Sequence, residues 1–169
     1  MSDAITIEID VPEPTRRSIA ACQDKPGLGR RIARAMDREN ELTVNRIQQK
    51  LTGEVLNVQT GLLRKSIGRT ETVVLDEEVQ SSVGSGATFG KASVAYAAIH
   101  EFGGQTRPHK IVAKNGKALS FGGIFRHSVN HPGSKIPARS YIGSTIADRA
   151  PDYARSITSA AGEFMGGRA

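Results

Sequence analysis

The pair His100-Glu101 comes closest in this sequence to the residues of a catalytic zinc site. In a metalloprotease helix a second histidine follows four residues after the first, so that both imidazoles lie on one face and bind the metal. Position 104 of this chain is glycine, so the motif is incomplete. The other histidines are His109, His127 and His131. Their spacing specifies no metal site, and loop histidines are more often exposed or hydrogen-bonded than bound to a metal.

Other catalytic patterns are also incomplete. Gly90-Lys91 resembles the end of a phosphate-binding loop, but Ser85 and Ala92 stand where that loop needs a glycine and a serine or threonine. Cys22 has no histidine nearby in the sequence, and no serine lies in a nucleophile elbow. The acidic run at residues 76–78 is typical of a solvated turn. We therefore expect a protein without enzymatic activity, cofactor or metal.

The composition predicts a single domain with a mostly aliphatic core. The chain has 169 residues, of which 38% are hydrophobic and 5% aromatic, and it has no Trp. This length fits one globular domain, and so few aromatic residues supply a poor platform for base stacking. The longest apolar run, residues 94–99, is far shorter than the ~20 residues that a membrane-spanning helix needs. We expect no membrane partner.

The cysteine content and the N-terminus indicate where the protein is made. One cysteine cannot form an internal disulfide, which agrees with a reducing compartment. The first ten residues lack the basic and apolar segments of a secretory signal. We expect synthesis in the cytoplasm.

Charge is segregated along the chain, although the formal net charge is only +6. The first 13 residues carry acidic side chains and no Lys or Arg; the acids are Asp3, Glu8, Asp10 and Glu13. Residues 102–140 carry basic side chains and no Asp or Glu; these are Arg107, Lys110, Lys114, Lys117, Arg126, Lys135 and Arg139. The basic stretch predicts a surface for phosphates or for carboxylates of a neighbouring chain, with a solvated loop as the alternative.

Hydrophobic periodicity predicts the elements of the first half. Residues 4–11 alternate as a strand with one buried face, and Pro12 and Pro14 end it. A short helix at residues 16–22 is possible before Pro26 and Gly27, which should break it. An amphipathic helix should run from Leu28 to near Gly53. Its expected core residues are Leu28, Ile32, Ala35, Met36, Leu42, Ile47 and Leu51, and its expected outer residues are Arg30, Arg34, Arg38 and Lys50.

Turn chemistry and alternation predict the middle of the chain. Thr60 is a candidate N-cap for about two helical turns that Gly68 would close. Residues 70–75, 78–84 and 91–97 should form three antiparallel strands in a meander. A basic excursion at residues 105–140 should contain a hairpin of residues 110–113 and 117–121 around Asn115-Gly116. Residues 125–129 should return as a strand, followed by a turn at residues 131–133 and an extended segment at 136–141.

The last predicted element is a helix over residues 141–165, which Pro151 should interrupt or kink. Its core candidates are Ile142, Ile146, Tyr153, Ile157 and Phe164. The whole pattern predicts an α+β fold, in which a twisted antiparallel sheet packs against a long N-terminal helix and a C-terminal helix, with a projecting β-hairpin excursion. We expect an N-terminal strand and arm at 1–27, a single domain at 28–165 and a frayed end at 166–169.

Three short segments, taken in order, resemble those of a known family. Residues 58–67, with Thr60, Gly61, Leu62 and Ser66, resemble its "TG-L-x-x-SI" segment. Residues 96–104, with Tyr96, Glu101, Phe102 and Gly103, resemble its "Y-A-x-x-x-E-F-G" segment. His131-Pro132-Gly133, followed by Pro137-Ala138-Arg139, resembles its "HPG … PAR-P-F/Y" segment, although Ser140 stands where Pro is common. The family is that of tailed-phage tail-completion and head-tail joining proteins, which includes virion morphogenesis proteins of Mu-like phages.

This resemblance implies a structural virion protein in the neck of a tailed phage. It implies a ring, most often sixfold, that completes or terminates the tail and joins it to a head connector or stopper on one side and a tail tube or terminator on the other. The acidic N-terminal strand and the basic excursion are complementary, as a head-to-tail ring contact requires. The interface residues we expect are Arg107, Lys110, Lys114, Lys117, Arg126, Glu8 and Asp10. The alternative is a DNA-binding module in which the excursion contacts phosphates, including packaged DNA in the channel.

Overall fold

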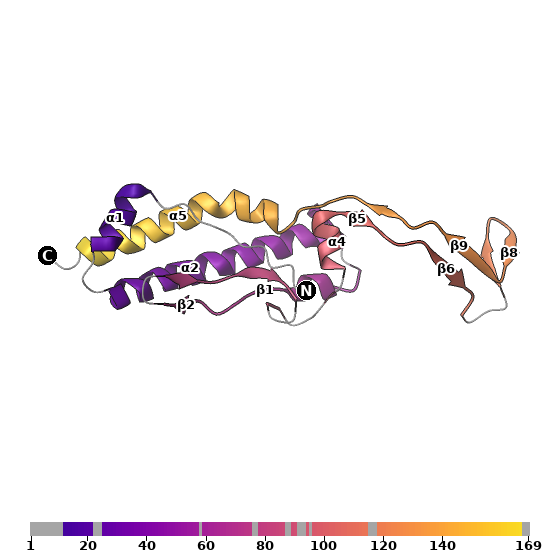
Figure 1. Ribbon diagram of the computed structural model, residues 1–169, viewed down its shortest axis with the longest axis horizontal. Helices are drawn as coiled ribbons and strands as arrows, with labels where there is room; N and C mark the ends of the chain where they lie inside the picture. Colours follow the sequence, from indigo (N-terminus) through magenta and orange to yellow (C-terminus); the bar gives the residue numbers. More distant parts are fainter. Residues whose placement is uncertain are drawn as a thin grey trace.

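The computed structural model describes residues 12–21, 25–57, 59–75, 78–86, 89–90, 94, 96–114 and 118–166. Two long helices and a slender two-stranded arm dominate it (Figure 1). The strand predicted at residues 4–11, with Glu8 and Asp10, lies outside the described residues. The predicted α+β class, with its long N-terminal helix, C-terminal helix, antiparallel pairing and projecting hairpin, is confirmed.

The body is built on an antiparallel pair of helices, α2 (Lys25–Gln49) and α5 (Gly143–Gly166). Contacts along the pair run in opposite directions on the two helices, from Arg31–Glu163 through Thr43–Tyr153 to Lys50–Asp148. A π-helical turn (Lys50–Glu54) extends α2, and the short α1 (Glu13–Ala21) packs against α5 (Figure 1).

Two apolar clusters lie at the two ends of the helix pair, with a polar layer between them. The first contains Ile47, Leu51, Ile67, Val83, Tyr141, Ile142 and Ile146. The second contains Leu28, Ile32, Ile157 and Ala161, with Ile19, Met36, Val79 and Phe164 partly buried around it. Most of the predicted core residues therefore lie in one of these clusters, as amphipathic helices require.

Two positions of the helix predicted from Leu28 to near Gly53 differ from the prediction. Leu42 is 47% exposed, because Thr43 occupies the inward position of that turn and Leu42 lies about 100° away around the helix. Lys50 was expected outside but is only 6% exposed. Its ammonium group donates to Ser144 Oγ at 2.9 Å and lies 3.4 Å from Asp148 Oδ2, so the buried charge is compensated by α5.

The short helix predicted at residues 16–22 is present as α1, which ends at Ala21, ahead of Pro26. Pro26 and Gly27 lie inside the first turn of α2, where a proline needs no backbone N–H and is tolerated. Helix α5 runs through Pro151 as one element instead of being interrupted there. Ile146 and Tyr153 are buried on either side of Pro151, and this packing outweighs the loss of one backbone hydrogen bond.

The predicted meander is replaced by a hairpin against α2. Strand β1 (Ile67–Arg69) pairs with β4 (Val83–Ser85), and β2 (Val73–Val74) pairs with β3 (Val79–Gln80). Within the described part of the chain, all strands pair in two-stranded ladders. Of the predicted third strand, residues 91–93 and 95 lie outside the described residues and Ala97 begins a helix. Gly68 lies in β1 and does not close the preceding helix, which is the single-turn α3 (Leu62–Ser66).

A hairpin arm (Gly104–Ile136) leaves the body after helix α4 (Ala97–Phe102) and extends far from it (Figure 1). At its base β5 (Gly104–Gln105) pairs with β10 (Lys135–Ile136), and farther out β6 (His109–Val112) pairs with β9 (Ser128–His131). Both ladders share one register, in which Pro108 faces Pro132. Neither proline has an N–H to donate, so the ladder is interrupted at that level.

The hairpin predicted around Asn115-Gly116 is wrong in its pairing. Residues 110–112 pair with β9, and β7 (Leu119–Phe121) pairs with β8 (Ile124–Arg126) at the tip. The tip turn is Gly122-Gly123, where both residues have positive φ as a two-residue hairpin loop requires. Two turn signals, Asn115-Gly116 and Gly122-Gly123, lie close together in this segment, and the local sequence does not indicate which of them forms the hairpin turn.

Candidate functional site

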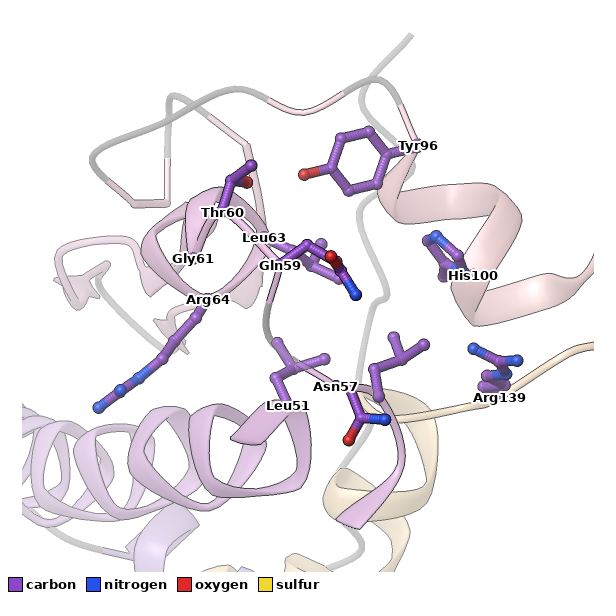
Figure 2. Close-up of a pocket in the computed structure, with 11 residues that line it drawn as sticks. Leu51, Asn57, Gln59, Thr60, Gly61, Leu63, Arg64, Tyr96, His100 and Arg139 are labelled. Carbon is purple, nitrogen blue, oxygen red and sulfur yellow. The ribbon is translucent and has the colours of Figure 1, made fainter. Parts of the chain in front are cut away.

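The three motif segments converge where the arm joins the body. Residues from each of them line one half-open pocket of about 530 Å³ (Figure 2). Thr60 and Leu63 come from the first segment, Tyr96 and His100 from the second, and Arg139 from the third. The sequence motifs, which are far apart in the chain, therefore form one structural unit.

Glu101 ties the second segment to the third. Its side chain is 4% exposed, and its carboxylate accepts hydrogen bonds from the backbone N–H groups of Tyr141, Ile142 and Gly143 at 2.8, 2.9 and 2.8 Å. The Ser140 hydroxyl also donates to it at 3.0 Å. These N–H groups lie at the N-terminus of α5, where the backbone N–H groups have no acceptor within the helix. The positive end of the helix dipole at the same place favours a negative charge. Glu101 therefore acts as an N-cap supplied from another helix.

Tyr141 completes the same connection. Its ring is fully buried, and its hydroxyl donates to Ala97 O, in the first turn of α4, at 3.1 Å. Burial raises the pKa of the Tyr141 phenol well above its usual range, and the Glu101 carboxylate raises it further. The neutral phenol, which can donate this bond, is therefore the favoured form.

Gly103 allows the chain to pass close to the third segment. A Cβ at this position would lie 2.7 Å from Ala138 N, and its φ is +74°. The preceding motif residue, Phe102, is 59% exposed, so it does not contribute to the core. The glycine is explained by backbone packing, whereas the phenylalanine presents an apolar ring to the outside.

The first segment is anchored through Ser66. Its buried hydroxyl donates to Leu63 O at 2.7 Å and lies 2.7 Å from Ser85 Oγ, which joins α3 to β4. Thr60 Oγ1 accepts only a long bond, 3.4 Å, from Leu62 N, and Gly61 occupies the N-cap position with a φ of 72°. Thr60 is therefore a weaker cap than its sequence position predicted.

The pocket has the character of a binding surface. Its floor is apolar, from Leu51, Leu56 and Leu63, and no carboxylate is among its lining residues. His100 and Arg139 lie at one edge, while Arg64 extends outward from α3 (Figure 2). His100 Nδ1 is buried and has no hydrogen-bond partner among the described residues. Apolar walls with cationic edges suit an acidic side chain or peptide end of a partner.

Most of the predicted interface residues are on the hairpin arm. Arg107, Lys110, Lys114 and Arg126 are all exposed, and they are spread from its base to its tip. Lys117, Glu8 and Asp10 lie outside the described residues. Across the ladder, His109 stacks on His131 with ring centroids 5.1 Å apart, and His131 Nδ1 accepts from Gly133 N at 3.0 Å.

A match to a known protein family decides which family the chain belongs to. A family model described as the phage virion morphogenesis family matches residues 17–151, a span that includes all three motif segments and the whole arm. The chain belongs to the phage virion morphogenesis family. The family predicted from the motifs is thus confirmed, and with it a role in building the phage particle. Comparison with curated proteins and with solved structures finds no match.

No group of three or more His, Cys, Asp or Glu side chains within the described ranges is arranged to hold a metal ion. Among the described helices, none combines the length and the apolar character needed to cross a bilayer.

Sequence reasoning missed the apolar side chains of the arm of this morphogenesis protein. Ile111, Val112, Ile124 and Phe125 are all exposed, and Phe125 is 72% exposed. A signal was present, because apolar residues lie between basic ones in a stretch with no acidic residue. The structure adds that the outer strands of the arm extend away from the helical body and do not pack against it (Figure 1).

Replacing Gly133 by Ala is expected to loosen the arm near its base. Gly133 has a φ of +92°, and a Cβ there would lie 2.1 Å from Thr106 O on the opposite strand. Gly123→Ala is the matched control, because Gly123 also has a positive φ (+79°) but a Cβ there would have nothing within 4 Å. Backbone amides of β5 and β6 should exchange at least about 10-fold faster in Gly133→Ala than in the control. Equal exchange rates in the two variants would contradict this role for Gly133.

Proposed function

We propose that this virion morphogenesis protein forms a ring in the phage neck, where it completes or terminates the tail and joins it to the head connector. The observation that carries the proposal is the hairpin arm. It extends away from the helical body, and its β6 and β8 side chains are exposed.

An arm of this kind needs a partner. A two-stranded ribbon is at best marginally stable in water, and a run of exposed apolar side chains marks an interaction surface. Phe125 and Ile124 at the tip have no part of their own chain to cover them in the described structure. A neighbouring protein that covers the tip would supply the missing burial.

A ring follows from the asymmetry of the contact. The arm and the helical body are different surfaces, so an arm that binds the body of another copy makes a head-to-tail contact. Such contacts close into a ring when the rotation between copies permits. The family resemblance makes six copies our expectation.

The motif pocket is our candidate for contact with another neck component. It lies at the base of the arm, and its Arg64 and Arg139 have no acidic partner among the described residues. An acidic segment of a head connector or stopper, or of a tail tube or terminator, fits its charge and its leucine floor.

DNA binding through the arm is the second candidate, because residues 102–140 contain no acidic side chain. Affinity for duplex DNA that falls steeply with salt would support this alternative. Phosphate contacts do not, however, explain the exposed apolar tip.

The proposed neck role is tested by removing the protein from the phage that encodes it. With a stop codon early in the gene, we expect lysates to contain filled heads and separate tails by electron microscopy. Supplying the intact gene from a plasmid should restore complete particles. Complete, infectious particles without the protein would contradict the proposal.

A further inference from the structure

An open groove on the body is a candidate receptor for the arm. It lies between α2 and the β1 edge, has a volume of about 530 Å³, and is lined in part by Glu41 and Val44 from α2 and by Glu71 and Phe89. Val44 and Phe89 give it an apolar part, and both glutamates are exposed.

The groove is acidic in net effect. Neither Glu41 nor Glu71 has an ion-pair partner among the described residues. The groove's cation, Arg69, is already engaged, because it donates to Asp37 Oδ1 at 2.7 Å. The two free carboxylates therefore dominate the local potential.

The arm tip has the complementary character. Phe125 is 72% exposed and Ile124 53%, and Arg126 follows them on the same strand. Because no acidic residue lies between residues 102 and 140, nothing on the arm neutralises this arginine.

The motif pocket fits the tip poorly. The charged residues that line the motif pocket are Arg64 and Arg139, which would repel Arg126. The tip also cannot bind its own groove, since the arm extends away from α2 and β1 (Figure 1). The contact must therefore join two copies.

We propose that the arm tip of one copy, residues Ile124–Arg126, docks in the α2–β1 groove of the next copy. Ile124 packs against Val44 and Phe89, and Arg126, which lies on the same face of β8, pairs with Glu41 and Glu71, while Phe125 lies on the opposite face of the strand. Tip and groove are different surfaces, so each copy offers one of each and the contact propagates around a ring. This inference rests on the proposed function, because both require copies to associate through the arm.

A charge-exchange experiment tests the pairing. Light scattering should show that Arg126→Glu and Glu71→Arg each raise the concentration for half-assembly at least about 10-fold. The double variant restores opposite charges and should assemble within about 3-fold of the unmodified protein. Lys135→Glu, the same charge change at the arm base, is the matched control and should assemble normally. Circular dichroism checks that every variant is folded.

The outcomes separate the inference from the proposed function. If Arg126→Glu blocks assembly but Glu71→Arg does not, the arm contact stands and the groove is the wrong receptor. A double variant that assembles no better than the single variants would also overturn the pairing.

Cross-linking provides a second readout if assembly is weak. Copies carrying Ile124→Cys and copies carrying Thr70→Cys, both with Cys22→Ser, are mixed under mild oxidation. We expect disulfide-linked dimers only in the mixture. An unmodified protein that stays monomeric and a mixture without cross-links would overturn both proposals.

Discussion

Glu101→Ala is expected to lower the free energy of unfolding by about 3 to 5 kcal/mol. The substitution leaves three backbone N–H groups at the start of α5 without their acceptor, in a place where water has little access. Each buried donor left unpaired costs about 1–3 kcal/mol. Chemical denaturation followed by circular dichroism measures the change.

Two further variants make this prediction specific. Glu101→Gln keeps the shape but turns one acceptor into a donor, so it should lose about half as much stability. Glu54→Ala removes an exposed carboxylate paired with Arg46 and should cost less than about 1 kcal/mol. A loss at Glu101→Ala no larger than at Glu54→Ala would contradict the capping role.

The Glu101 cap also bears on function. The extended residues 137–140 lead from the arm's returning strand into α5, and Arg139 N donates to His100 O at 2.9 Å. Weakening the cap should therefore loosen the attachment of the arm as well as the helix. This is a physical reason for the glutamate in one motif and the Pro-Ala-Arg segment in another to occur together.

Glu39→Ala should destabilise the protein by about 3 kcal/mol, because it removes one half of a part-buried ion pair and leaves Arg149 only its weaker contact with Asp152 among the described residues. Glu39 pairs with Arg149 across the helix interface, where their side chains are 9% and 18% exposed. Arg149 Nε also donates to Thr43 Oγ1 at 3.0 Å, and Ser156 Oγ donates to Glu39 at 2.6 Å. Denaturant unfolding is again the measurement.

A double variant separates the ion pair from the shape of the site. Glu39→Met with Arg149→Met removes both charges and leaves no buried charge unpaired. It should be more stable than Glu39→Ala alone by about 2 kcal/mol. If the double variant is less stable than Glu39→Ala, the polar layer contributes more through its hydrogen bonds than through charge compensation.

Periodic elements were predictable from the sequence because their own pattern defines them. The spacing of apolar residues predicts helices α2 and α5. Gly103-Gly104, several turn signals and the basic stretch at residues 102–140 predict the arm. The structure differs from the prediction where a residue far away in the sequence determines the burial or the strand pairing. Lys50 is buried because Ser144 and Asp148 meet it on the other helix, and the strand at residues 110–112 pairs with residues 128–130 instead of its near neighbours.

The candidate site was predictable in content but not in geometry. Resemblance singled out Glu101 and Arg139, yet nothing local shows that Glu101 caps a helix 40 residues away or that Arg139 lines the same pocket as Thr60. The groove residues Glu41 and Glu71 belong to no sequence motif, and in the sequence nothing distinguishes either of them from any other exposed glutamate. They form one acidic surface only because the fold brings α2 beside β1.

The mass of the protein in solution, measured by light scattering together with negative-stain imaging, tests the arm-mediated ring most directly. The full chain is compared with one in which Asn-Gly replaces residues 107–133, so that Thr106 and Ser134, which face each other, are joined by a short turn. We expect rings from the full chain and a folded monomer from the shortened one. Rings from the shortened chain, or a full chain that stays monomeric at every concentration, would contradict the assignment of the arm as the contact between copies.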